Sequence, residues 1–293
     1  MKAATEDISA IHDGPGLFKP KLVMCNFIPE IQKLGDFARQ HDFSGIDYSF
    51  DLENLPRTPA LESSWVKEMA TLEPFEVRYH CPFERVDLGH DDTEKAEEAE
   101  ALFRRVIRLI SKAGGRYVTI HIGLGHDSTE PLSWESSIDK LRRLVNFGRT
   151  MKVKVCLENL AWGWTSKPNL FEKLVRRSGA GITLDIGHAH ACESVQSKHY
   201  TFEDFIAPHP EKVFNAHIYH TEIPDQGHIT PKIVGDIAER LSLLRDIDCN
   251  WWVLEIRQKE GLLKTRKIVD EYLTRILHEA SVASPTKQGG KSL

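Results

Sequence analysis

Six short apolar runs of β-type residues each lead into a side chain that can bind a metal ion. These side chains are His80, His121, Glu158, Asp185, His217 and Glu255. Successive members lie 27 to 41 residues apart, which is about the length of one strand plus one helix. Parallel strands that close into a barrel bring their carboxyl ends to one mouth. The spacing therefore predicts a ring of ligands around a single site.

Eight β-type runs can be counted, and most are apolar up to a polar end, as expected for strands buried on both faces. They cover residues 21–28, 45–50, 76–83, 117–123, 153–160, 181–189, 213–220 and 250–256. Helical periodicity fills the intervals between them. Helices are predicted at 29–40, 61–72, 94–113, 133–150, 168–178, 201–207, 231–245 and 264–280. This strict alternation predicts an α/β fold, a single (β/α)₈ TIM barrel.

The length of 293 residues fits one such barrel with short tails. We expect the barrel domain to cover residues 20–282, and we expect residues 1–19 and 283–293 to be disordered tails. The composition, with 41% hydrophobic and 28% charged residues, is that of an ordinary globular protein.

Charge and hydropathy weigh against some classes of function. The net charge of −5 weighs against a dedicated nucleic-acid binder. No apolar run approaches the roughly 20 residues that span a bilayer, and the polar N-terminus is unlike a secretory signal. The five cysteines form no CxxC pair, which is typical of free thiols in a reducing compartment. We therefore expect a cytoplasmic protein without membrane contact.

Each residue of the ring has an ordinary structural interpretation when it is taken alone. A histidine at a strand end is often a hydrogen-bonded core residue, and a glutamate such as Glu158 can form a salt bridge. Asp185 with His188 is more specific, because a D-x-x-H turn places two ligand types on one short loop. Clustered carboxylates resist burial unless a positive charge lies between them. A divalent cation (Mn²⁺, Zn²⁺, Co²⁺ or Mg²⁺) suits such carboxylates and imidazoles.

The motifs around these residues resemble the site motifs of the xylose isomerase-like TIM-barrel superfamily. That superfamily contains sugar isomerases, ketose 3-epimerases, inositol-catabolism enzymes and endonuclease IV. The matching motifs are HCPF at 80–83, LENL at 157–160, LDIGHAHA at 184–191, AHIYH at 216–220 and LEI at 254–256. The resemblance covers roughly residues 20–280 and implies the barrel fold.

In the isomerase and epimerase branch, one divalent metal is held by a Glu, an Asp, a His and a second Glu on four successive strands. The resemblance implies that Glu158, Asp185, His217 and Glu255 are these ligands. It also implies that His188 contacts substrate oxygens. Such a cation stabilises the enediolate formed when a sugar loses a carbon-bound proton, and Glu158 and Glu255 are the candidate acid and base. This predicts a metal-dependent isomerase or epimerase of a sugar, sugar phosphate or polyol.

Endonuclease IV is the alternative within the same superfamily, and it uses a larger ligand set for up to three zinc ions. His80 and His121 match its two earlier histidines, and Asp225 with His228 approximates its last pair. The chain departs from that pattern because it has Asp-x-x-His where the nuclease has Asp-x-His. His220 also stands where the nuclease has an acidic residue. This interpretation predicts a phosphodiesterase that acts at abasic sites in DNA.

Three further residues are candidates for substrate binding. Trp162 and Trp164 follow Glu158 and could form an apolar wall against a sugar face, or could pack within their loop. Arg257 could bind an anionic or hydroxyl group, or could form an outer salt bridge. A barrel that binds a small molecule without turnover is a third class of function. The expected partner is a small sugar or polyol, and the sequence leaves the oligomeric state open, a homo-oligomer included.

Overall fold

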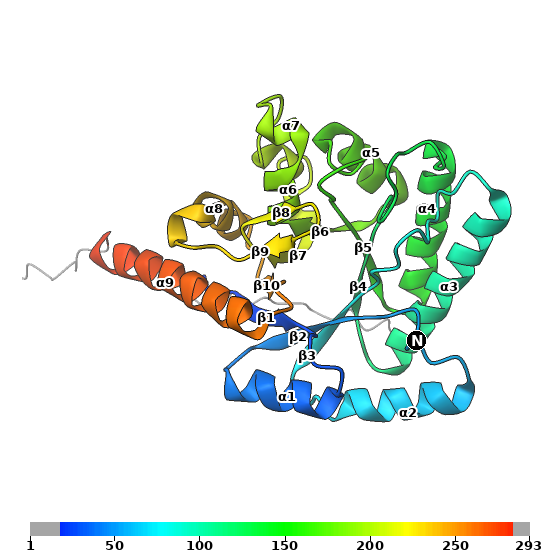
Figure 1. Ribbon diagram of the computed structural model, residues 1–293, viewed down its shortest axis with the longest axis horizontal. Coiled ribbons are helices and arrows are strands. Elements are labelled where there is room, and N and C mark those ends of the chain that lie inside the picture. The colour runs from blue at the N-terminus through cyan, green and yellow to red at the C-terminus, as the bar shows by residue number, and fades with distance from the viewer. Residues whose placement is uncertain (1–17, 284–293) are drawn as a thin grey trace, which may run out of the picture.

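Eight parallel strands close into a barrel in the order β1-β10-β7-β6-β5-β4-β3-β2 (Figure 1). This computed structural model describes residues 18–283, so most of both predicted tails lies outside the described residues. The barrel strands are β1 Lys21–Cys25, β2 Gly45–Ser49, β3 Glu76–His80, β4 Tyr117–Ile120, β5 Lys154–Glu158, β6 Gly181–Asp185, β7 Val213–Ile218 and β10 Trp251–Leu254. The predicted (β/α)₈ barrel is confirmed.

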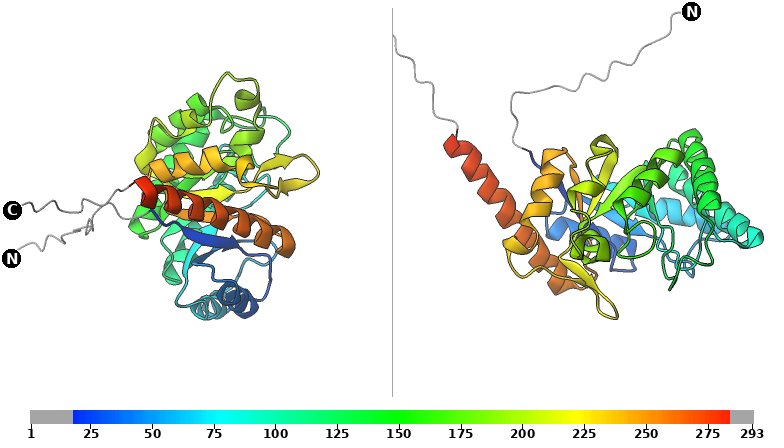
Figure 2. Two further views of the ribbon diagram at one scale, coloured as in Figure 1. Left: turned by 90° about the vertical axis from the view of Figure 1, so that its left-hand side faces the viewer. Right: turned by 90° about the horizontal axis from the view of Figure 1, so that it is seen from above.

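Helices surround the barrel and bury an apolar core between themselves and the strands (Figures 1 and 2). The α-helices are α1 Ile31–Gln40, α2 Pro59–Ala70, α3 Thr93–Lys112, α4 Trp134–Thr150, α5 Pro168–Ser178, α6 Ile186–Ala191, α7 Glu193–Gln196, α8 Ala238–Asp246 and α9 Lys259–Ala283. Three 3₁₀ turns are η1 Glu203–Phe205, η2 Pro210–Lys212 and η3 Val234–Asp236. Among the described residues, no helix is long and apolar enough to cross a bilayer.

Several sequence-based boundaries were wrong, including the following three and the start of the last helix, which begins at Lys259 and not at residue 264. The strand predicted at 181–189 ends at Asp185, because the Asp185 side chain caps the helix that follows. The helix predicted at 201–207 is only the short turn η1, and the one predicted at 231–245 begins at Ala238 after η3. Periodicity did not reveal these breaks, since it carries no information on how a chain caps or tightens its turns.

An antiparallel hairpin that was not predicted follows β7. Its strands are β8 Thr221–Ile223 and β9 Gly227–Ile229. It projects beyond the carboxyl ends of the barrel strands (Figure 2). The hairpin therefore lies beside the mouth at which the sequence places the ligand ring, with Glu222 next to His188.

The inside of the barrel below this mouth is polar and is filled around Arg78. The guanidinium of this buried side chain donates to the Phe214 carbonyl and to Asn215 Oδ1, both at 2.6 Å. It lies 3.9 Å from the ring centroid of Tyr117 and 4.2 Å from that of Trp251. Arg78 thus closes the lower part of the barrel with hydrogen bonds and cation–π contacts.

Replacing this arginine should destabilise the barrel. We expect Arg78→Met to lower the free energy of unfolding by about 2 to 4 kcal/mol, because it removes the donor from the buried Asn215 Oδ1 and from the part-buried Phe214 carbonyl. Lys21→Met is the control, since Lys21 forms an exposed ion pair with Glu76 at the same end of the barrel. Loss of this ion pair should lower the free energy of unfolding by less than about 1 kcal/mol. Urea denaturation measures both, and equal effects would contradict this role for Arg78.

Candidate metal centre

Four of the six ring residues form one compact cluster at the mouth of the barrel. Glu158 and Asp185 are the last residues of β5 and β6, His217 lies near the end of β7, and Glu255 directly follows β10. Side chains in a strand alternate between its two faces, and these four share the inner face. One donor atom from each lies within 4.8 Å of the others, and all four residues are buried.

Asp185 is held in place by its own backbone and by Asn159. Its Oδ1 accepts a hydrogen bond from the His188 amide at 2.6 Å and so caps α6. The side chain of Asn159 donates to the Asp185 carbonyl at 2.9 Å and accepts from the Asp185 amide at 2.8 Å. These contacts fix Asp185 and leave Oδ2 directed toward the cluster, 3.7 Å from His217 Nδ1.

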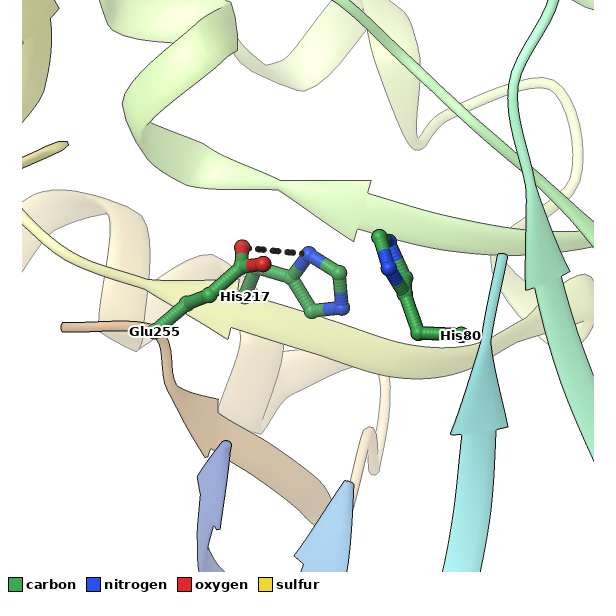
Figure 3. Close-up of side chains that lie close together, drawn as sticks. All are labelled: His80, His217 and Glu255. Carbon is green, nitrogen blue, oxygen red and sulfur yellow. Dashed lines mark ion pairs between the residues drawn. The ribbon is translucent and has the colours of Figure 1, made fainter. Parts of the chain in front are cut away.

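His217 lies among the three carboxylates. Its Nδ1 is 2.9 Å from Glu255 Oε2 and 3.3 Å from Glu158 Oε1. Figure 3 shows Glu255 facing this nitrogen, with His80 on the other side of the His217 ring. One imidazole nitrogen is thus close to an oxygen of each carboxylate in the cluster.

The cluster contains buried polar atoms that form no aligned hydrogen bond among the described residues, although some of them lie at ion-pair distance from one another. They are Asp185 Oδ2, Glu255 Oε2 and both ring nitrogens of His217. Burying such atoms without a partner is unfavourable, and native structures rarely do so without an ion or water. Carboxylate oxygens and imidazole nitrogens are suitable ligands for Zn²⁺, Mn²⁺ or Co²⁺. The residues therefore fit the divalent cation that the sequence predicts.

Charge within the cluster agrees with this interpretation. Burial alone would raise the pKa of Glu158, but the facing imidazoles of His217 and His121 hold it well below its usual range. Burial likewise acts to raise the pKa of Glu255, and His217 and His228 outweigh it and lower the pKa. Burial would lower the pKa of His217, yet Glu158 and Glu255 hold it well above its usual value. The carboxylates thus attract positive charge to the centre of the site.

His80 and His121 form a second donor group on the other side of Glu158. Their Nε2 atoms lie 3.0 Å and 3.1 Å from Glu158 Oε2, whereas Oε1 of the same carboxylate faces His217. The Nδ1 atoms of both histidines are buried and without a partner in the described chain. Glu158 therefore lies between two donor groups, and either could hold a cation.

The nuclease-like pair predicted at Asp225 and His228 does not come together. Asp225 is exposed at the turn of the hairpin, with a positive φ of 64°. His228 instead forms a potential ligand group with Asp185 and His188. Its ring stacks on Tyr219, with centroids 3.9 Å apart and planes 9° apart. The hairpin register thus directs His228 inward and leaves Asp225 at the tip.

The structure places the three candidates for substrate binding in different surroundings. Trp162 is partly buried beside Gly123, just beyond His121, and so lies near the mouth. Trp164 packs edge-on against Trp134, with ring centroids 5.1 Å apart, which is the loop-packing alternative. Arg257 is exposed and forms no ion pair within the described part of the chain.

Sequence reasoning missed two acidic residues that face the site. Asp47 on β2 is 2% exposed, and burial raises its pKa although His80 and His217 oppose this. Glu222 on β8 lies with Oε2 3.2 Å from His188 Nε2. An acid inside the apolar run GIDYSF was a signal for Asp47. No comparable signal existed for Glu222, because its position depends on the hairpin.

A comparison with family models finds the family that the barrel and its motifs indicate. The family described as "Xylose isomerase-like TIM barrel" matches residues 36–273. The chain belongs to this family. An uncharacterized protein of Methanocaldococcus jannaschii is 26% identical over 197 residues, which cover 67% of this chain and 80% of that protein.

Solved structures of an epimerase and of an endonuclease IV share the fold of this chain. An L-ribulose 3-epimerase superposes with a TM-score of 0.70 at 16% identity, covering 92% of this chain and 100% of the other. An endonuclease IV from Thermus thermophilus superposes with a TM-score of 0.62 at 14% identity, covering 87% and 100%. At such identities the likeness establishes the fold alone, so the choice between branches depends on the site.

A substitution at Gly187 tests how closely α6 packs against Tyr219 behind the site. A Cβ at Gly187 would lie 2.0 Å from the ring of Tyr219, the ring on which His228 stacks. We expect Gly187→Ala to lower the free energy of unfolding by about 1 to 3 kcal/mol through overpacking. Gly235→Ala is the control, because the nearest atom to its Cβ is 3.6 Å away. Urea denaturation would contradict the packing argument if both substitutions were neutral.

Proposed function

We propose that this protein is a divalent-metal-dependent isomerase or epimerase of a sugar, sugar phosphate or polyol. The observation that carries the proposal is the buried set of Glu158, Asp185, His217 and Glu255, whose donor atoms lie within 4.8 Å of one another. Such a set combines a cation site with two glutamates that can transfer protons. The barrel, residues 20–282, is the single catalytic domain in this proposal.

The four residues would hold one Mn²⁺, Zn²⁺, Co²⁺ or Mg²⁺ ion. A bound ion would supply a Lewis acid that polarises a substrate carbonyl and would stabilise the negative charge that develops when a carbon-bound proton is lost. Asp185 and His217 then act only as ligands, since Asp185 is fixed as a helix cap and His217 is enclosed by carboxylates.

Glu158 and Glu255 are the groups that move protons. The facing imidazoles lower the pKa of both groups, so both are ionised near neutral pH. The ionised carboxylate is the form that can accept a proton from a carbon beside a carbonyl. An isomerase returns the proton to the neighbouring carbon, and an epimerase returns one to the opposite face of the same carbon. The two glutamates lie on β5 and just after β10, so they approach a bound substrate from different strands.

His188 and the hairpin complete the site. The carboxylates of Asp185, Glu158 and Glu222 outweigh the effect of burial and hold the pKa of His188 well above its usual value. A charged His188 can donate hydrogen bonds to substrate oxygens. Trp162 supplies an apolar surface near the mouth, where the face of a sugar ring can pack. The hairpin places Glu222 and His228 beside His188 in the same region.

Removing the proton acceptor should strongly reduce the exchange of carbon-bound substrate protons with solvent. Glu158→Gln should reduce exchange of carbon-bound substrate protons with D₂O by about 100-fold or more, because the amide cannot act as a base. The measurement is proton NMR over a panel of ketoses, aldoses and their phosphates. Glu135→Gln, which changes an exposed carboxylate on α4, is the control. Wild-type exchange by Glu158→Gln with full metal content would refute the role of Glu158.

A second function is supported by the additional donor group at His80 and His121. Together with Glu158, these residues could hold a further zinc ion, and Asp185, His188 and His228 could hold another. Such a set suits a phosphodiesterase at abasic DNA sites, because several cations together neutralise a phosphate group. Asp225 plays no part in this version, since it is exposed at the hairpin turn.

An incision assay separates the two functions. The isomerase or epimerase proposal predicts no cleavage of an abasic duplex by the zinc-loaded or manganese-loaded protein. Cleavage that His121→Gln lowers by about 100-fold would instead establish the phosphodiesterase. Cleavage unaffected by His121→Gln would indicate a contaminating nuclease, and the control is an intact duplex of the same sequence.

A further inference from the structure

A basic pocket opens at the amino ends of the strands, on the opposite side of the barrel from the metal centre. It has a volume of about 620 Å³ and includes Tyr117, Lys154 and Gly181, the first residues of β4, β5 and β6. Glu158 is four residues further along β5 than Lys154, which corresponds to about 13 Å. The pocket is therefore separate from the catalytic mouth.

Five cationic side chains line the pocket, and none of its lining residues is acidic. The cations are Arg116, Arg149, Lys152, Lys154 and Lys212. Within the part of the chain that the structure describes, none of the five forms an ion pair. Other bases behave differently, since Lys21 at the same end of the barrel pairs with Glu76, and Arg177 pairs with Glu135. A concentration of unneutralised positive charge is unusual in a chain of net charge −5.

The floor of the pocket is apolar and aromatic. Tyr117 and Phe214 lie with ring centroids 5.9 Å apart, and both are partly exposed. Lys154 Nζ lies 3.4 Å from the centroid of Phe214, so this cation covers one face of the Phe214 ring. Gly181 packs closely against this floor, since a Cβ at Gly181 would lie 2.8 Å from the Phe214 ring.

We propose that this pocket binds a small organic phosphate that carries a planar aromatic or heteroaromatic ring. The ring packs against the apolar part of the lining, which includes Val145, Val153 and Val155 beside the two aromatic rings. The phosphate contacts the surrounding cations, for which Arg149 offers a planar guanidinium. The volume lies within the range of small-molecule sites. Nucleic acids are bound by extended basic surfaces, whereas this charge is gathered in one concave pocket.

Isothermal titration calorimetry on the full chain tests the proposal, with adenosine 5′-monophosphate and flavin mononucleotide as probes. At least one of them should bind about tenfold more tightly than inorganic phosphate or adenosine, because only the probes combine a ring with a phosphate. The proposal is overturned if neither probe binds at millimolar concentration. It is also overturned if inorganic phosphate binds as tightly, or if single-stranded oligothymidylate binds more tightly than both probes.

Matched charge variants on and beside α4 locate the site. Arg149→Gln with Lys152→Gln should weaken binding of the probe about tenfold or more, since charged contacts to phosphate are lost. Arg142→Gln with Arg143→Gln removes the same charge from α4 outside the pocket and should leave the affinity unchanged. Equal losses in both pairs would overturn the proposal. Thermal melting confirms that each variant is folded, and failure of the metal-centre proposal would leave these results unaffected.

Discussion

Three carboxylates are buried beside one another at the mouth of the barrel, and the surrounding structure has to compensate for their mutual repulsion. Glu158, Asp185 and Glu255 are at most 6% exposed, and their oxygens surround one nitrogen of His217. Like charges at this separation would oppose folding in a medium of low polarity. The histidines offset part of the repulsion by attracting protons, and a divalent cation would offset it more completely. The requirement for positive charge at this point explains why so many imidazoles converge here.

The remainder of the barrel holds these groups in position. Asn159 ties the backbone at Asp185 to the neighbouring strand, so the carboxylate keeps one oxygen as a helix cap and presents the other to the site. Below the cluster, Arg78 fills the barrel and satisfies acceptors on β7. The basic pocket lies beyond this floor, where the same strands begin. The two ends of one set of strands thus present opposite charges.

Much of the fold and part of the site could be predicted because both depend on the strands. Each of the six ring residues lies at or near the end of a strand, and parallel strands in a closed barrel leave only one place where such ends meet. Features that depend on loop conformation could not be predicted. Asp225 and His228 lie on a hairpin whose register directs only His228 inward, and Trp164 is held by a contact with the distant Trp134.

The central claim is that the four-residue cluster holds a divalent cation. Inductively coupled plasma mass spectrometry on undialysed protein tests it most directly, with Asp185→Asn as the matched variant, since asparagine preserves the helix cap but not the charge. The account predicts about one divalent ion per chain in this cluster, and its loss in the variant. A folded wild-type protein without metal, even after incubation with Mn²⁺, Zn²⁺, Co²⁺ and Mg²⁺, would contradict it.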